Sequence, residues 1–252
     1  MNFKTFLRKM FSTRVCVLCD DAISWDQKSY ICEECFEEWD NLLETRCNRC
    51  GEDRHTCNCL PSLIRKNFKV CSWAVFYTPS GIKNDNDEIS LTNLLVYRLK
   101  YSKFRLCINF CAEVMKDALI ETCHKHGINF REYAVTYSPR RKINKFRYEY
   151  DQSKELAKRL AQLLNIDFVE ALENVGKSEQ KKLSAIERRR NAQKSYVLKE
   201  NFVNKHQKYF LVDDIITTGS TLVFCARLLQ SAGATDIIPV TYAKDNFKYK
   251  GD

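Results

Sequence analysis

The chain has 252 residues, of which 29% are charged and 44% are apolar, a mixture typical of a soluble globular protein. No run of 18 apolar residues exists, so the sequence predicts no transmembrane helix, and residues 1–11 lack the continuous apolar segment of a secretory signal. The 13 cysteines are odd in number and argue against a secreted disulfide framework, so we expect a cytoplasmic protein.

The net charge of +9 is unevenly distributed. Residues 1–70 hold 11 Lys/Arg and 11 Asp/Glu, whereas residues 71–252 hold 30 and 21. The larger, second part is therefore basic, which favours phosphorylated or polyanionic partners.

Residues 1–15 are expected to form an amphipathic helix. Apolar side chains at 3, 6, 7, 10 and 11 fall on one helical stripe, with basic residues off it. Such a helix either docks on its own protein or lies on an anionic membrane surface. The second alternative would place residues 3–11 at the inner face of the membrane as a peripheral contact.

Residues 16–60 form a cysteine-rich module with four closely spaced cysteine pairs. Two such pairs complete a tetrahedral four-cysteine zinc site, and without a base nearby the sites are expected to be closed and structural. Sequential pairing gives one site from Cys16, Cys19, Cys32 and Cys35 and a second from Cys47, Cys50, Cys57 and Cys59. Interleaved pairing stays an alternative, and so does His55 as a substitute ligand in the second site. Trp25, Tyr30, Phe36 and Trp39 are expected to fill the module's small apolar core.

After a linker over residues 60–69, strands and helices alternate through residues 70–252, which predicts an α/β domain with a mostly parallel sheet. We expect strands at 70–77, 133–137, 167–172, 209–212 and 236–243, and helices at 91–101, 106–126, 156–164 and 222–229. Two runs are basic. Residues 139–159 hold eight Lys/Arg and three Asp/Glu, and residues 177–194 hold seven Lys/Arg and two Asp/Glu. Each is typical either of a solvated helix face or of an anion-binding surface.

The stretch from Phe210 to Thr221, FLVDDIITTGST, carries the clearest chemistry. A short apolar run suits a strand buried on both faces, which places Asp213 and Asp214 at its carboxyl end, where open α/β sheets bind ligands. Two carboxylates can accept both hydroxyls of a diol. The following loop opens a helix whose amides can hold a phosphate, with the glycine allowing close approach. The loop residues are Thr217, Thr218, Gly219, Ser220 and Thr221.

This stretch resembles the phosphoribosyl pyrophosphate (PRPP) motif of type I phosphoribosyltransferases. Together with the cysteine module it makes nearly the whole chain similar to the ComF family, in particular its ComFC-type competence proteins. The resemblance extends to Lys100-Tyr101, to Pro139 after the second strand, to Gln152, and to the pattern of Gln180, Leu183, Arg188 and Asn191. It implies a type I phosphoribosyltransferase fold preceded by a zinc ribbon.

The resemblance also implies ligands and roles. PRPP would be bound with Mg²⁺, by Asp213 and Asp214 at the ribose diol and by residues 217–221 at the 5′-phosphate. Either aspartate would stabilise the positive charge that develops when pyrophosphate leaves. A basic cleft would hold the pyrophosphate, through Lys100, Arg140, Arg141, Arg147 and Arg188. The resemblance further implies a role in natural transformation, through DNA uptake and the handling of single-stranded DNA. Single-stranded DNA and other competence proteins would then be its partners.

Departures from the family pattern fall on the pyrophosphate and acceptor side. Glu173, Val175 and Lys177 replace the arginines and threonine that usually precede the later motif, and the Arg-Gly before Gln152 is not kept. The sequence therefore leaves open whether PRPP is turned over. The alternatives are a PRPP-binding factor that handles DNA, with Phe146, Tyr148 and Tyr150 as stacking faces, and an active transferase acting on an amine or nucleobase.

Overall fold

A computed structural model describes residues 14–23, 29–78, 91–101, 105–140, 151–176 and 195–246. The amphipathic stripe at residues 3–11, Trp25, the aromatic residues of 146–150 and the basic run at 177–194 lie outside the described residues. No described helix combines the length and the apolar character that a membrane crossing requires.

The centre of the fold is a parallel sheet of four strands in the order β1-β6-β5-β2, which confirms the predicted α/β architecture. A separate antiparallel pair, β3 and β4, lies beside it. The bounds are β1 Ser72–Tyr77, β2 Ala134–Tyr137, β3 Leu172–Asn174, β4 Tyr196–Leu198, β5 Lys208–Ile216 and β6 Asp236–Asp245.

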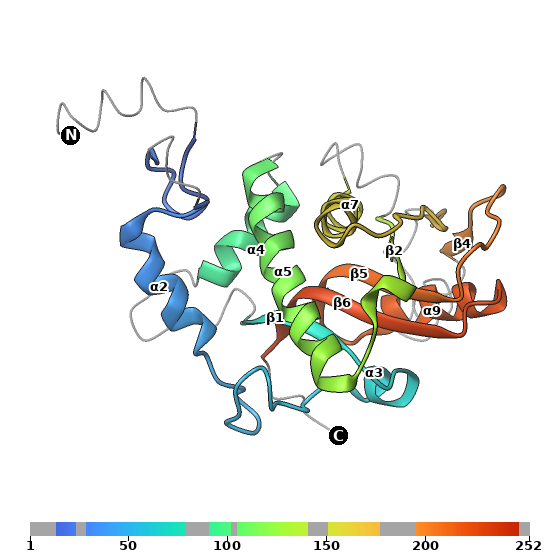
Figure 1. The fold of residues 1–252 in the computed structure, drawn as a ribbon. Coiled ribbons are helices and arrows are strands. Elements are labelled where there is room, and N and C mark those ends of the chain that lie inside the picture. The colour runs from blue at the N-terminus through green and yellow to red at the C-terminus, as the bar shows by residue number, and fades with distance from the viewer. Residues whose placement is uncertain are drawn as a thin grey trace, which may run out of the picture.

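Helices cover both faces of the sheet (Figure 1). Contacts of α4, α5 and α7 place them on one face, and α9 covers the other face, with α3 packed against it. The bounds are α2 Glu33–Leu43, α3 Ser62–Asn67, α4 Leu91–Tyr101, α5 Arg105–His126, η1 Phe130–Glu132, α7 Gln152–Leu164 and α9 Ser220–Ser231.

The central strand β5 explains why its apolar run shows no alternation. Phe210 and Val212 pack in the core beneath α5 and α7, whereas Tyr209 and Leu211 pack in the core beneath α9. All four side chains are 0% exposed, because helices lie on both sides of the strand.

The first cysteine cluster belongs to the larger of these two cores. Trp39 of α2 contacts Phe110 of α5 edge-on, with 4.8 Å between ring centroids, and Tyr30 lies 6.2 Å from the same ring. The Tyr30 hydroxyl donates to Glu113 Oε1 at 3.0 Å. The cysteine-rich residues are therefore packed against the sheet domain through α5.

Two expectations from the sequence are wrong, and the linker holds a helix that was not expected. Residues 167–172 form no continuous strand: Phe168 makes an isolated bridge with Val135, and β3 begins only at Leu172. The linker contains α3, whose Ile64 is 0% exposed. Phe36 is 51% exposed and fills no core, because α2 turns its neighbours Cys35 and Trp39 inward.

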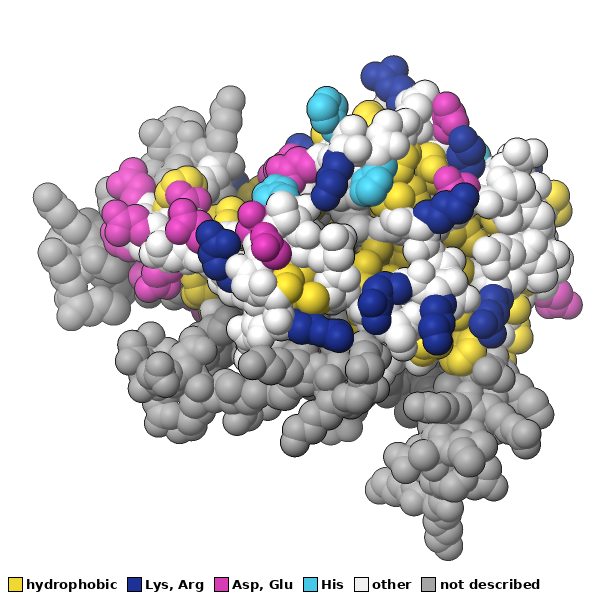
Figure 2. Space-filling view, turned by 90° about the horizontal axis from the view of Figure 1, so that it is seen from below, with side chains coloured by type: hydrophobic (Ala, Val, Ile, Leu, Met, Phe, Trp, Pro, Cys, Tyr) yellow, Lys and Arg dark blue, Asp and Glu magenta, His cyan; other side chains and the backbone are white. Residues whose placement is uncertain are grey.

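Figure 2 shows one face of the molecule, seen from below. Acidic side chains gather at the end that carries α2, and a row of Lys and Arg side chains lies further along the same face. The acidic end agrees with the exposed residues of α2, which are Glu33, Glu34, Glu37, Glu38 and Asp40. On this face, basic side chains therefore gather away from the acidic helix α2.

Candidate functional site

A crevice opens at the carboxyl ends of the neighbouring strands β2 and β5. The chain leaves β2 toward α7 on one face of the sheet and leaves β5 toward α9 on the other. Neighbouring strands whose connections leave to opposite faces open a ligand crevice at this point. A cavity of about 400 Å³ occupies it, lined by residues from both loops and from the start of α7.

Asp213 and Asp214 line this cavity, and the first turn of α7 holds them. Ser153 Oγ donates to Asp213 Oδ1 at 3.1 Å, and Gln152 Nε2 donates to Asp214 Oδ2 at 2.9 Å. The backbone amides of Asp214 and Ile215 donate to Asp213 Oδ1 and Asp214 Oδ1 at 2.9 and 2.8 Å. Both carboxyl groups are thus oriented before any ligand arrives.

The two carboxyl groups have different electrostatic settings. Burial, followed by the charge of Asp214, raises the pKa of Asp213 from 3.8 to about 8, against the hydrogen bonds from the hydroxyls of Ser138 and Ser153. Asp214 is 14% exposed and has Lys100 Nζ at 3.9 Å from Oδ2. Two neighbouring carboxyl groups do not both ionise readily, so this pair favours sharing one proton over carrying two negative charges.

The loop after β5 leads directly into the amino end of α9. Its N-cap residue is Gly219, whose φ of +76° lies in the left-handed region and which caps the helix with no side chain. The hydroxyls of Thr218 and Ser220 bond each other at 3.0 Å. The first amides of this 12-residue helix carry the positive end of its dipole, a setting that suits an anion.

Of the predicted basic residues, the structure places Lys100 and Arg140 at the cavity. The backbone amide of Arg140 donates to Asp151 Oδ2 at 2.8 Å, which ties the loop after β2 to the N-cap of α7. Arg141, Arg147 and Arg188 lie outside the described residues.

The predicted PRPP-motif residues divide into two groups. Asp213, Asp214, Thr217 and Thr221 line the cavity. Thr218, Gly219 and Ser220 form the adjacent turn and are not among its lining residues.

Sequence reasoning missed four lining residues, Ser138, Ser153, Asn174 and Tyr196. Ser138 follows β2 and Ser153 lies in the first turn of α7, the two positions from which a short side chain reaches the crevice. Asn174 Nδ2 donates to the carbonyl of Pro139 at 3.3 Å, so β3 is fixed to the loop after β2. A polar residue directly after a predicted strand was the available signal for Ser138.

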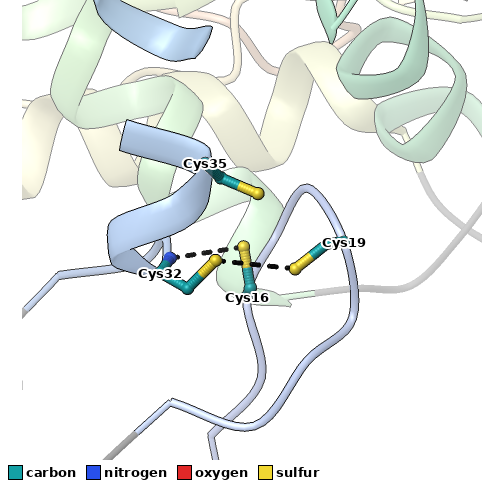
Figure 3. Close-up of side chains that lie close together, drawn as sticks. All are labelled: Cys16, Cys19, Cys32 and Cys35. Atoms are coloured by element: carbon teal, nitrogen blue, oxygen red, sulfur yellow. Dashed lines mark hydrogen bonds between the residues drawn. The ribbon is translucent and has the colours of Figure 1, made fainter. Parts of the chain in front are cut away.

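The eight amino-terminal cysteines form two clusters with sequential pairing, and interleaved pairing does not occur. Figure 3 shows the four sulfur atoms of the first cluster facing one another. Cys19 Sγ and Cys32 Sγ are 3.6 Å apart, and the amides of Leu18 and Cys32 donate to Cys16 Sγ at 3.4 Å each. The cysteines are free rather than disulfide-bonded.

Both clusters fit a zinc ion. Within each, the sulfur atoms lie within 4.8 Å of one another, and Cys50 Sγ is 3.8 Å from Cys57 Sγ in the second. A tetrahedron with Zn–S bonds of about 2.3 Å has sulfur–sulfur edges of about 3.8 Å. Four cysteines complete such a site, so each centre would be closed and structural. His55 belongs to neither cluster and pairs with Glu121 instead, at 3.4 Å.

The chemistry of the cavity follows from its donors and acceptors. It offers two oriented carboxyl groups to hydroxyls and Lys100 and Arg140 to negative charge, and it meets the amino end of α9 at Thr217 and Thr221. This combination suits a phosphorylated sugar better than an apolar ligand.

Comparison with known proteins finds a similar sequence and similar structures. The chain is 29% identical over 153 residues to "Competence protein F" of Haemophilus influenzae, a match that spans 58% of this chain and 64% of that protein. This match confirms the predicted resemblance to the ComF family. No protein-family model matches the chain.

The structure resembles part of a solved protein described as "structure of the allosteric regulatory enzyme of purine biosynthesis". The TM-score is 0.34 at 16% identity, and the match covers 61% of this chain and 27% of that chain.

Proposed function

We propose that this ComF-like protein binds PRPP together with Mg²⁺ in the cavity between β2 and β5, on a domain of the type I phosphoribosyltransferase kind. The observation that carries the proposal is the adjacency of the carboxyl pair Asp213–Asp214 to the glycine-capped amino end of α9. A ribose 5-phosphate has a diol and a phosphate at the two ends of one ring, and these are the two groups that such a site recognises.

Each part of the ligand has a matching group in the cavity. Asp213 and Asp214 accept hydrogen bonds from the ribose hydroxyls, and the amides of residues 217–221 hold the 5′-phosphate. Lys100 and Arg140 supply positive charge for the pyrophosphate. Mg²⁺, when bound, neutralises pyrophosphate charge through phosphate and ribose oxygens and waters rather than through an all-protein site.

The same groups would assist transfer if the protein is an enzyme. Departure of pyrophosphate leaves positive charge on the anomeric carbon, as in glycoside hydrolysis. The negative charge of Asp214, which Gln152 and the amide of Ile215 hold in place, would stabilise that charge. The acceptor would be an amine or a nucleobase nitrogen.

Calorimetric titration of the zinc-loaded protein with PRPP and Mg²⁺ tests binding. Asp213→Asn/Asp214→Asn should weaken binding by about 1.5–3 kcal/mol for each charged hydrogen bond that is lost. Asp117→Asn is a matched control, because this carboxylate of α5 is 66% exposed and distant in sequence from the motif. Unchanged affinity in a folded double variant would remove the motif from this role, and release of pyrophosphate with added amines tests turnover.

We infer a second role, in natural transformation, from the name of the similar Haemophilus protein and from the net charge of +9. Arg140 at the cavity, together with the other basic residues of the run 139–159, would contact the sugar-phosphate backbone of single-stranded DNA. Binding would then weaken with salt, with a slope of roughly −0.7 per phosphate contacted.

A fluorescence-anisotropy titration with single-stranded DNA separates this role from PRPP binding. Charge reversal at Arg140, Arg141 and Lys142 should weaken DNA binding and flatten the salt slope, and PRPP should compete if the two ligands share the cavity. Reversal of the exposed Arg65, Lys66 and Lys69 is the control of equal charge change. If the wild-type protein binds no single-stranded DNA at low salt, the contact mechanism is wrong and a role through partner proteins remains.

A further inference from the structure

Lys244, in the carboxyl half of β6, is buried beside the second cysteine cluster. Its side chain is 1% exposed, and Nζ lies 3.5 Å from Cys57 Sγ and 3.9 Å from Cys47 Sγ. The rings of Trp73 and Phe76 of β1 lie beneath the same nitrogen, at 5.5 and 4.8 Å from their centroids. Both cysteines and both aromatic residues belong to one apolar cluster.

A buried ammonium group requires negative charge nearby. Without a partner it would be strongly disfavoured, and cation–π contacts with two rings offset only part of that cost. The hydrogen-bond partners of Lys244 Nζ are sulfur atoms, and neutral thiols are weak acceptors. A zinc ion bound by four thiolates carries a net charge of −2, so a metal-loaded second cluster is the partner that this lysine fits.

The residue directly after β6, Asn246, makes further hydrogen bonds to the turn that contains the first two cysteines of the second cluster. Asn246 Oδ1 accepts from the amide of Asn48 at 2.9 Å, and Asn246 Nδ2 donates to the carbonyl of Arg46 at 3.1 Å. The amide of Asn246 donates to the carbonyl of Tyr77 at 2.7 Å. The turn that contains Cys47 and Cys50 is thus bonded to β6 and, through β6, to β1.

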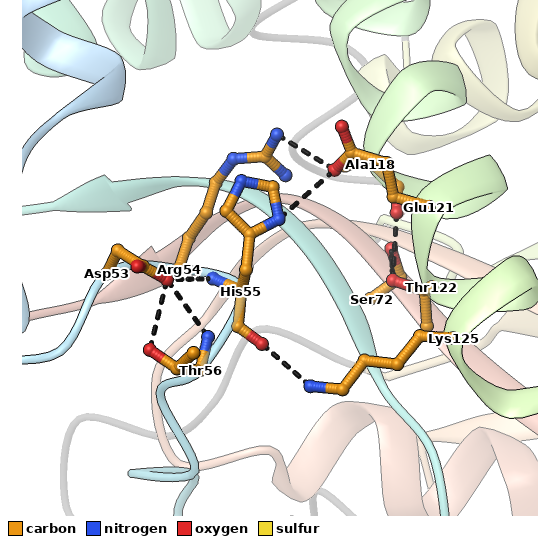
Figure 4. Close-up of polar contacts among 9 residues, drawn as sticks. All are labelled: Asp53, Arg54, His55, Thr56, Ser72, Ala118, Glu121, Thr122 and Lys125. Carbon is orange, nitrogen blue, oxygen red and sulfur yellow. Dashed lines mark hydrogen bonds and ion pairs between the residues drawn. The ribbon is translucent and has the colours of Figure 1, made fainter.

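The other half of the cluster is docked on α5 (Figure 4). Arg54 Nη2 pairs with Glu121 Oε2 at 2.9 Å, and Lys125 Nζ donates to the carbonyl of His55 at 2.7 Å. Asp53 Oδ1 accepts from the amides of His55 and Thr56, which closes the turn before Cys57. Both cysteine turns therefore rest on elements of the sheet domain.

We propose that Lys244 is the counter-cation of the second zinc–thiolate centre and that this centre is part of the sheet domain's core. Lys244 is paired in register with Phe76 of β1 and with Ile216 of β5, the residue that precedes the loop of the candidate site. The second zinc ion therefore holds the carboxyl ends of β1 and β6 through Lys244, and its loss loosens this edge of the sheet.

The test compares Lys244→Met with the wild-type protein, both purified with zinc. Methionine keeps an unbranched stem and removes the charge. Zinc transfer to a chromogenic chelator, followed by N-ethylmaleimide labelling and peptide mass spectrometry, reports which cysteines lose metal. We expect about 10–100-fold weaker zinc retention at the second cluster, as for other groups that contact metal ligands, with the first cluster unchanged.

Two control variants separate charge from general effects. Lys208→Met removes a charge from β5 at a side chain that is 36% exposed and paired with Glu132. Val75→Ala removes buried apolar volume from β1 without removing a charge, since Val75 belongs to the core beneath α5. Both should keep wild-type zinc retention, and Lys244→Arg should retain zinc better than Lys244→Met because it keeps the charge.

Two outcomes overturn the proposal. One is a folded Lys244→Met protein whose second cluster keeps wild-type zinc retention, and the other is equal zinc loss in Val75→Ala. If Lys244→Met does not fold, amide exchange of the wild-type protein decides. Removal of zinc from the second cluster should then increase exchange in residues 75–77 and 243–246, and unchanged protection there would refute the role.

Discussion

Ile64 lies directly over the α-carbon of Gly219, so that a Cβ built on this glycine would lie 2.5 Å from both Cγ1 and Cδ1 of Ile64. Ile64 belongs to α3, which lies in the sequence between the second cysteine cluster and the first strand of the sheet. Gly219 is the N-cap of α9 in the candidate PRPP loop. The linker helix therefore packs directly behind the turn at Gly219. Two constraints favour glycine at position 219: its φ of +76° and the close approach of Ile64, which leaves no room for a Cβ.

Gly219→Ala should therefore affect both stability and ligand binding. Left-handed strain and the contact with Ile64 together should cost about 1–3 kcal/mol of the free energy of unfolding, measured by urea denaturation. Displacement of the turn should weaken PRPP binding by at least about tenfold, because the amides no longer face the phosphate.

The matched control for Gly219→Ala is Gly127→Ala. Gly127 has φ +63°, but no atom lies within 4 Å of the position that an added Cβ would take, so it carries the strain without the contact. Ile64→Ala alone should be costly because this side chain is fully buried, so Gly219→Ala is also measured in the Ile64→Ala background, where it should cost less than in the wild-type protein. If both glycine variants lose the same stability and Gly219→Ala costs as much in the Ile64→Ala background as in the wild-type protein, Ile64 does not constrain the turn.

Asp213 predicts a proton linkage to ligand binding. Its pKa is raised to about 8 by burial and by Asp214, and a ribose hydroxyl together with nearby Mg²⁺ favours the ionised form. Binding at pH 7 should release close to one proton, and affinity should rise with pH up to about 8. Calorimetry in buffers of different ionisation enthalpy measures the release, which should vanish in Asp213→Asn and persist in Asp117→Asn.

The same group makes the unliganded protein less stable at higher pH. A carboxyl whose folded pKa is raised from 3.8 to about 8 contributes stability that is complete below pH 4 and is lost as pH rises to 8. Asp213→Asn should remove this part of the pH dependence. Identical pH profiles for the free energy of unfolding in the two proteins would contradict the raised pKa.

Gln152 should affect binding more than stability. Its Nε2 orients Asp214, but its buried Oε1 has no hydrogen-bond partner among the described residues. Gln152→Met removes the useful donor together with the unpaired acceptor, so the free energy of unfolding should change by less than about 1 kcal/mol. PRPP affinity should fall by about tenfold in calorimetry, and equal loss of stability and affinity would indicate a packing role only.

The features that the sequence predicted well each lie within one contiguous segment. The motif from Phe210 to Thr221 combines strand, acceptors and helix start in one stretch, and each CxxC pair sets its own turn. By contrast, the contact of Ile64 with Gly219 joins residues far apart in sequence, and nothing in the local pattern of α3 indicates it. Ser138 and Ser153 likewise lack a periodic signal, because their position depends on which strands become neighbours.

The inward face of α2 could not be identified from residue type alone, and this gives the last prediction. Trp39 is 5% exposed and contacts Phe110 of α5, whereas Phe36 on the same helix is 51% exposed. Trp39→Ala should cost about 3–5 kcal/mol of the free energy of unfolding, because it leaves a cavity where the first cysteine cluster meets the sheet domain.

Phe36→Ala is the matched aromatic control and should stay within about 0.5 kcal/mol of the wild-type protein, because the side chain is mostly in solvent. If the cysteine-rich part shares its core with the sheet, Trp39→Ala should also lower the unfolding midpoint of the whole chain in a single transition. Far-ultraviolet circular dichroism measures this transition, because it reports the backbone rather than the tryptophan. Two separate transitions, with only the first shifted by Trp39→Ala, would show instead that α2 and its zinc centre unfold independently of α5.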